Sequence, residues 1–509
     1  MPSALGLSNG ETRDDGAGGT SYRSLLVFVT LAVLGIVVTL VNLKQPFVRN
    51  DLVYARAAEH VIKSGYDPRP VVADSKLSYD KPIGFAWLGA PLVATFGTHT
   101  GLRVLSLFGT LFFLWAARGF IEALDPFRQS DREHAAALLL VGLNPIVAYQ
   151  FWSAYPDSLF AGLVLVAWTL TIRLVDEPER AYLRRAALLG LVCMIGLMMK
   201  NYALVLLGSV PLYVLLHLRQ LWGRPSRPWR MLAGLVAALL TAAAFAALGR
   251  KGLNPLVRLA GEGGGSELYG QGRLKINVVG TLLQIAVFGL VNLHVALVFV
   301  LRRENVNRRV LAVLSALVMP YVLGLMDFPA TYYNMRYFLP LLPFVAVLAV
   351  EGWRKARPAL RPVAAGVYAI VALAAIAVFN LTPVYEIAAP WIPSLVFTRG
   401  YLGLGFLDNL RMPEHRARAE ELARVNAQVE PNGVLYMVNC LYYGDAMDGA
   451  YEEAGLIRPD IQTRYVLAEG FQPSEKRFYV WLFWADARVL AAFEEVTELG
   501  PGLYRVTRG

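Results

Sequence analysis

The sequence predicts a polytopic α-helical membrane protein, with about 11 transmembrane helices followed by a small C-terminal α/β domain. Three observations lead to this fold class. Of the 509 residues, 56% are hydrophobic and only 17% are charged, whereas soluble domains carry about 25% charged residues. Apolar runs of bilayer length recur along the chain up to Leu381. The last part of the chain instead has the alternating pattern of soluble strands and helices.

The membrane spans are predicted from the apolar runs. A polar tail, residues 1–22, is expected to be disordered and cytoplasmic, and the run Leu25–Leu43 after it is long enough to cross a bilayer once. The further predicted spans are Leu102–Ile121, Ala135–Trp152, Ser158–Leu174, Ala186–Met199, Tyr202–Leu216, Met231–Leu248, Val278–Leu301, Val310–Met326, Tyr337–Val350 and Val363–Leu381.

The basic residues predict the orientation. The chain has 48 Lys and Arg against 38 Asp and Glu, a net charge of +10. Within the membrane region 23–384, most of the arginines gather in alternate segments between spans: 118–132, 173–185, 219–230, 302–309 and 354–361. This is the positive-inside pattern, so these segments and the N-terminus are expected in the cytoplasm. Nucleic-acid binding would need the basic residues clustered on a soluble surface, so we expect no nucleic-acid partner.

The arginine pattern is regular only if the run Ile83–Gly97 does not cross the membrane. This run is also short for a crossing, so we expect an interfacial helix on the outer leaflet. The chain then divides into a transmembrane domain at 23–384, with an outer loop at 44–100, and an extracytoplasmic α/β domain at 385–509. In that domain we expect a helix at His415–Val429, a second helix at Asp486–Val496, and strands at Gly433–Cys440, Thr463–Ala468, Arg477–Trp484 and Leu503–Thr507.

Charged residues converge on the outer membrane boundary in this topology. Ionisable groups beside spans are costly and are candidates for function. The set comprises Asp51, Asp80, Lys81, Asp157, Lys200, Arg258, Arg273, Lys275, Asp327 and Arg336. Lysines and arginines there suit a lipid phosphate, and a nearby carboxylate suits a general base acting on an acceptor hydroxyl. Together they favour transfer of a group from a phospholipid-type donor.

Several short motifs occur in order along the outer face. They are Asn50-Asp51 after the first span, Asp80-Lys81-Pro82 before the interfacial helix, Tyr155-Pro156-Asp157-Ser158, Met199-Lys200-Asn201, and Arg336-Tyr337 before a Pro-rich span. This order resembles the GT-C superfamily of polyprenyl-phosphate-dependent glycosyltransferases, in particular the lipid A aminoarabinose transferases and the protein O-mannosyltransferases. The resemblance extends over most of the membrane region.

The resemblance implies an inverting glycosyltransferase of the plasma (inner) membrane. A sugar would pass from a polyprenyl-phosphate donor to a lipid, glycan or protein acceptor on the outer side of the bilayer. Asp51 would be the general base and Asp157 a second acid, while Lys81, Lys200 and Arg336 would bind the donor phosphate. Further possible site residues are Asp80, Arg258 and Asp327.

No metal or other cofactor is expected. Asn50-Asp51 lacks the Asp-x-Asp pattern of the metal-dependent oligosaccharyltransferase branch, and no His or Cys ligand spacing occurs. Ile83 also replaces a proline that is common after Lys-Pro in the family. This departure weakens the motif around Lys81.

Alternative interpretations remain open for each residue and for the whole chain. Asp51 and Asp157 would also stabilise helix N-termini, Lys81 and Lys200 would also reach lipid headgroups, and Arg336 would also anchor a span. One rival function is a lipid-diphosphate-dependent oligosaccharide polymerase or ligase. The other is a secondary transporter, which would place charges near mid-membrane.

Overall fold

The computed structural model describes twelve stretches of the chain and a few isolated positions between 365 and 373. The stretches are 22–47, 50–67, 83–124, 130–176, 182–200, 203–217, 308–326, 335–363, 413–439, 450–467, 471–482 and 487–508. The predicted tail 1–22, apart from its last residue, the spans Met231–Leu248 and Val278–Leu301, and most of Val363–Leu381 lie outside these residues.

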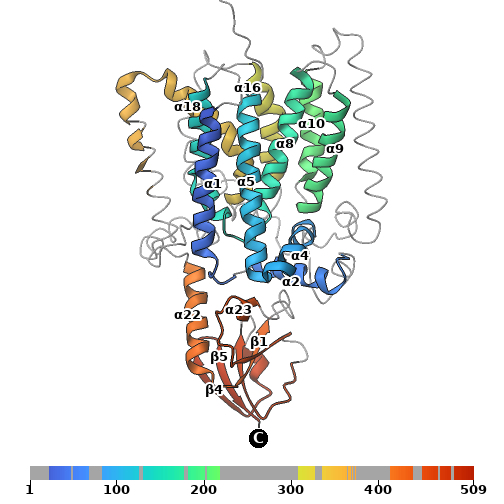
Figure 1. Cartoon of the computed structure of the whole chain (residues 1–509), viewed down its shortest axis with the longest axis vertical. Helices are drawn as coiled ribbons and strands as arrows, with labels where there is room; N and C mark the ends of the chain where they lie inside the picture. The colour runs from blue at the N-terminus through green and yellow to red at the C-terminus, as the bar shows by residue number, and fades with distance from the viewer. Residues whose placement is uncertain are drawn as a thin grey trace, which may run out of the picture.

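Apolar helices of different lengths run side by side in one bundle (Figure 1). They are α1 (Tyr22–Asn42), α5 (Thr98–Leu124), α8 (Asp157–Asp176), α9 (Tyr182–Met199), α10 (Leu204–Leu216), α16 (Arg308–Val313), α17 (Met319–Met326) and α18 (Leu342–Lys355). Within the described residues, four helical stretches are long and apolar enough to cross a membrane: Tyr22–Asn42, Thr98–Leu124, Asp157–Val175 and Arg336–Lys355. These four confirm predicted spans.

Helices α5 and α8 form the centre of the bundle and pack closely along their length. A glycine makes this approach possible, since a Cβ on Gly162 would lie 2.5 Å from the Phe112 ring. Further along α8, the buried Trp168 contacts Phe120 of α5 and Tyr321 of α17, with ring centroids 5.9 and 5.7 Å away. The apolar faces of three helices therefore meet at one indole.

The predicted span Ala135–Trp152 is wrong as a single crossing. The chain forms α6 (Asp131–Gly142) and then a short α7 (Pro145–Gln150). Asn144 separates them, because its side chain accepts a hydrogen bond from Ile146 N at 3.0 Å and Pro145 begins the new helix. A proline has no N–H to continue the α6 ladder. The 12 residues of α6 extend only about 18 Å, well short of a bilayer core.

Two of the predicted spans are helical but are not uniform α-helices. In Val310–Met326, a π-helical turn at Leu314–Val318 (η8) joins α16 to α17. In the run that includes Tyr337–Val350, a 3-10 helix at Met335–Leu341 (η10) precedes α18. Such irregular turns alter the direction of side chains at their ends, and η10 carries one of the predicted site residues, Arg336.

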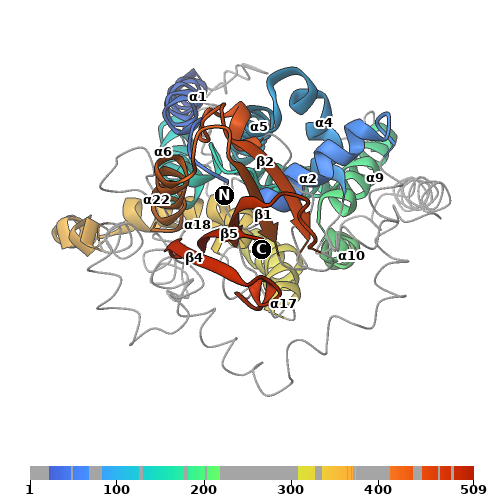
Figure 2. The same cartoon turned by 90° about the horizontal axis from the view of Figure 1, so that it is seen from below.

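Two helices lie across the end of the bundle rather than along it. They are α2 (Asn50–Lys63) and α4 (Gly84–Phe96). Figure 2 shows α1 end-on, whereas α2 and α4 are seen along their length. Helix α4 agrees with the predicted short helix at Ile83–Gly97, and its 13 residues span only about 20 Å. Its place on the outer leaflet stays a prediction.

The C-terminal part contains a five-stranded sheet in the order β2-β1-β3-β5-β4. The strands are β1 (Val434–Asn439), β2 (Gln462–Leu467), β3 (Arg477–Leu482), β4 (Glu495–Gly500) and β5 (Leu503–Thr507). β1 pairs in parallel with β2 and β3, and β5 pairs antiparallel with β3 and β4. The four predicted strands and the helix α22 (Pro413–Gln428) are present.

The predicted helix Asp486–Val496 is wrong. Only Ala487–Leu490 forms a turn of 3-10 helix (η13), and Glu495 already begins β4. Pairing of Val496 with Val506 extends the sheet by an edge strand, and this tertiary pairing outweighs the local helical pattern.

The sheet lies directly beyond the end of the bundle that carries α2 and α4 (Figures 1 and 2). The short helix α23 (Ala450–Glu453) packs on α5. Its Tyr451 hydroxyl donates to the Phe47 carbonyl at 3.3 Å, and its ring lies 6.1 Å from that of Trp481 in β3. The sheet is thus joined to the segment that leads into α2.

Candidate functional site at one end of the helix bundle

Three of the predicted site residues form one buried ion cluster, which we call the Asp157 cluster. Asp157 Oδ1 lies 2.6 Å from Lys200 Nζ, and Asp157 Oδ2 lies 3.2 Å from Arg336 Nε. The side chains of Asp157 and Arg336 are each 2% exposed and that of Lys200 is 7% exposed. Three segments remote in sequence therefore place charged groups at a single point.

The local sequence explains why these residues meet. Asp157 is the first residue of α8, where a carboxylate is favourable next to the helix dipole. Lys200 extends α9 by one further hydrogen bond, from its N–H to the Gly196 carbonyl at 2.9 Å. Arg336 lies near the start of η10, the 3-10 helix that leads directly into α18. Each residue stands at the end of an apolar helix, and all three helix ends lie on one side of the bundle.

Aromatic rings hold the two cations in place. The Arg336 guanidinium carbon lies 3.8 Å from the centroid of the Tyr155 ring, and Lys200 Nζ lies 4.5 Å from that of Tyr337. The Tyr337 carbonyl in turn accepts a hydrogen bond from the buried Tyr321 hydroxyl at 2.8 Å. These contacts fix the direction of the cations. Sequence reasoning did not select the three tyrosines for the site.

Asp51 lies in the first turn of α2 and has no exposed surface. Its charge acts on Arg103 of α5 and on Tyr451 of α23. One turn further along α2, Tyr54 lies edge-on to Tyr155, with ring centroids 6.3 Å apart. Asp51 and the Asp157 cluster are therefore linked through a Tyr54–Tyr155 contact, although they come from different loops.

Helix α4 begins against the end of α9. A Cβ on Gly84 would lie 2.6 Å from the carbonyl oxygen of Met198, so only glycine permits this contact. Met198 is close in sequence to Lys200, and the start of α4 therefore lies near the Asp157 cluster. The predicted site residues Asp80, Lys81, Arg258 and Asp327 lie outside the described residues.

Arg103 is a further buried residue that the sequence pattern did not single out. It is fully buried in α5 and donates hydrogen bonds to the carbonyl oxygens of Gln45 and Trp152. The signal was present in the sequence, since His99 and Arg103 stand one helical turn apart at the start of an apolar run, where ionisable groups are costly.

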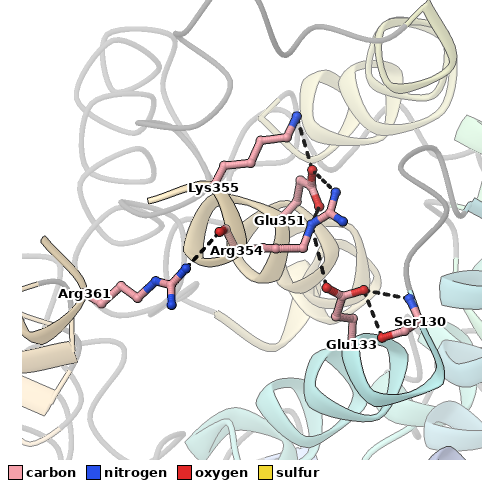
Figure 3. Close-up of polar contacts among 6 residues, drawn as sticks. All are labelled: Ser130, Glu133, Glu351, Arg354, Lys355 and Arg361. Carbon is pink, nitrogen blue, oxygen red and sulfur yellow. Dashed lines mark hydrogen bonds and ion pairs between the residues drawn. The ribbon is translucent and has the colours of Figure 1, made fainter. Parts of the chain in front are cut away.

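A second charged cluster, the Glu351 cluster, lies at the C-terminal end of α18, whereas Arg336 precedes the start of that helix. Figure 3 shows its residues. Glu351 in α18 has no exposed surface and pairs with Arg354 at 2.7 Å and Lys355 at 3.2 Å. Arg354 also lies 3.7 Å from Glu133 in the first turn of α6. Glu133 and Ser130 together form the capping box at the N-terminus of that helix. Helix α6 begins at this cluster and α18 ends at it. The other ends of both helices lie on the side of the bundle that holds Asp157.

The chemistry available at the Asp157 cluster is recognition of an anion. Asp157 is shared by two buried cations, Lys200 and Arg336. Arginine and lysine both suit phosphate. Among the residues that the structure describes, no group of three or more His, Cys, Asp or Glu side chains is placed to hold a metal ion.

Comparisons with known proteins show the fold. No family model and no curated protein sequence matches the chain. Among solved structures, the chain is similar to a crystal structure of ArnT from Cupriavidus metallidurans bound to undecaprenyl phosphate, with a TM-score of 0.53 and 14% sequence identity over 96% of this chain and 98% of that one. It is equally similar to ArnT in the apo state, with a TM-score of 0.53 and 14% identity over 95% and 97% of the two chains. The likeness confirms the predicted GT-C-like resemblance at the level of the fold.

Proposed function

We propose that this protein is an integral membrane glycosyltransferase that moves a sugar, with inversion, from a polyprenyl-phosphate donor to an acceptor. The observation that carries the proposal is the buried Asp157 cluster, with two cations on one carboxylate. The cluster lies in a fold shared along nearly the whole chain with an ArnT structure that binds undecaprenyl phosphate. The lysine and the arginine of the cluster suit a phosphate ligand.

Lys200 and Arg336 would bind the donor phosphate, and Lys81 would join them from the segment before α4. In the absence of donor, both cations pair with Asp157. When donor is bound, the same cations stabilise the charge that develops on the departing phosphate. Fixed charges in a site closed to water act strongly on such a charge.

Asp51 would act as the general base. It removes the proton from the acceptor hydroxyl as the hydroxyl oxygen attacks C1 of the sugar. The new C1–O bond forms while the bond from C1 to the phosphate oxygen breaks, and the electron pair of that bond stays on the phosphate. Asp51 has no exposed surface, which would favour transfer to an acceptor over hydrolysis by bulk water.

The site would face the outer side of the plasma (inner) membrane. The arginine-rich segments 118–132 and 354–361 adjoin the end of the bundle that holds the Glu351 cluster, and the positive-inside rule assigns that end to the cytoplasm. The Asp157 cluster, α2, α4 and the C-terminal sheet would then lie outside. Labelling of cysteines introduced into the C-terminal sheet of intact cells tests this orientation. Labelling that occurs only after lysis would show that the sheet lies in the cytoplasm.

The function is tested with the full chain in lipid nanodiscs. Radiolabelled sugars on polyprenyl phosphate and on polyprenyl diphosphate are supplied with membrane extracts as the source of acceptor. We expect transfer from a monophosphate donor, complete loss of transfer in Asp51→Asn, and wild-type transfer in Glu351→Gln. Transfer only from diphosphate donors would support a polymerase or ligase instead. Full activity in Asp51→Asn would disprove the general-base assignment.

A further inference from the structure

Arg103 connects the two segments that lead into the predicted acids. One guanidinium nitrogen, Nη1, donates to the Trp152 carbonyl, and the other, Nη2, donates to the Gln45 carbonyl. Trp152 comes shortly before Asp157, and Gln45 comes shortly before Asp51. One side chain on the central helix α5 therefore spans two backbone segments that are otherwise remote in sequence.

The surroundings of Arg103 hold its guanidinium in one orientation. Its carbon Cζ lies 5.1 Å from the Phe47 ring centroid and 5.4 Å from that of Trp152. His99, one turn earlier on α5, also contacts the Gln45 carbonyl, at 2.6 Å, and its ring stacks on Phe47 at 4.4 Å. The segment before Asp51 is thus fixed to α5 by two polar side chains and a ring stack.

Arginine is suited to this task. Its planar guanidinium offers several donors in a fixed fork, so two carbonyls can be held at a set separation. A lysine ammonium is a single point of charge and cannot reproduce that separation. The residue is also fully buried, away from any surface that would recognise a soluble ligand.

We propose that Arg103 is a positioning residue that sets the placement of Asp51 relative to Asp157 by bridging Gln45 and Trp152. This role rests on the proposed glycosyl transfer. A displacement of about 1 Å at a reacting group costs about 100-fold in rate, so loss of the bridge should lower kcat strongly. Donor binding depends on Lys200 and Arg336, so the KM for donor should change little.

The test compares substitutions of two arginines on the same helix. Arg103→Lys keeps the charge but not the fork, and Arg103→Met removes both. Arg118→Lys and Arg118→Met are the matched controls, since Arg118 also joins α5 to another helix, through Ser24 of α1 at 3.0 Å, but at the far end of the bundle. We expect kcat to fall about 10- to 100-fold in the Arg103 variants, a KM for donor within threefold of wild type, and wild-type kcat in both controls.

Amide hydrogen exchange gives a readout that does not depend on activity. Loss of the bridge should speed exchange in both the 45–51 and the 152–157 segments of the Arg103→Lys chain, with wild-type exchange there in Arg118→Lys. Unchanged exchange, or a change in one segment only, would overturn the bridge. A raised KM for donor with unchanged kcat would overturn the positioning role. If wild type transfers no sugar, the proposed function fails, while the exchange result still decides whether the bridge exists.

Discussion

The two charged clusters at the ends of the bundle each join a buried acid to an arginine and a lysine, but they differ in the exposure of the cations. In the Asp157 cluster, the side chains of Lys200 and Arg336 are 7% and 2% exposed, and both pair with Asp157. In the Glu351 cluster, Arg354 and Lys355 are 43% and 41% exposed, and Arg354 also lies near a second acid, Glu133. The cations of the second cluster are therefore open to the surface.

This difference is the reason that we propose a ligand site at one cluster and a structural role at the other. Exposed ion pairs contribute little to stability because water and salt screen them. Buried cations carry a large desolvation penalty, and arginine and lysine suit phosphate. We therefore propose that the Asp157 cluster binds the donor phosphate.

The largest expected effect follows from removing the acid of the Asp157 cluster. Asp157→Asn removes the carboxylate with which the buried Lys200 and Arg336 both pair, which should lower the free energy of unfolding by about 3–5 kcal/mol. Denaturant titration in detergent micelles measures the loss. Added undecaprenyl phosphate should restore part of it, because the phosphate replaces the missing charge. Wild-type stability in the variant would contradict the buried-charge interpretation.

A smaller effect is expected at the other end. Glu351→Gln leaves Arg354 and Lys355 able to reach water, so it should cost about 1–2 kcal/mol. Sugar transfer should be unchanged. The same titration and transfer assays check both results. A loss of transfer here without unfolding would show that the two clusters do not differ in function.

The smallest effect concerns the contact that joins the sheet to the bundle. Burial raises the pKa of the Tyr451 hydroxyl, so the folded chain retains a proton that the unfolded chain releases near pH 10. The contribution of the protonated Tyr451 hydroxyl to the free energy of unfolding is therefore complete below about pH 10, and it declines as the pH rises above that value. Between pH 8.5 and 11, the midpoint temperature of thermal unfolding should fall more steeply with pH in wild type than in Tyr451→Phe. Equal slopes would rule out this linkage.

Much of the fold was predictable because bilayer crossing imposes a simple pattern. The apolar runs at α1, α5 and α8 were recognised directly, as were the strands β1, β2, β3 and β5. The errors arose where local rules compete. Asn144 and Pro145 divide an apolar run into two helices, and edge pairing gives β4 in place of the end of a helix.

The candidate site was predictable in part for a topological reason. Asp157, Lys200 and Arg336 each follow or precede an apolar run on the same predicted side, so their convergence follows from the sidedness of the spans. The roles of Arg103 and Tyr337 were not predictable in this way. A hydrogen bond from Arg103 to the backbone of two distant segments depends on tertiary packing, which no local pattern encodes.

The central claim is that the Asp157 cluster, and not the Glu351 cluster, binds a lipid phosphate. The direct measurement is the affinity of undecaprenyl phosphate for the full chain in nanodiscs, compared among Lys200→Met, Arg336→Met, Arg354→Met and Lys355→Met. Loss of one charge-assisted contact is worth about 1.5–3 kcal/mol, so we predict at least about a 10-fold weaker affinity for each of the first two variants. The last two should bind as wild type does. Equal affinity in all four variants would contradict the account.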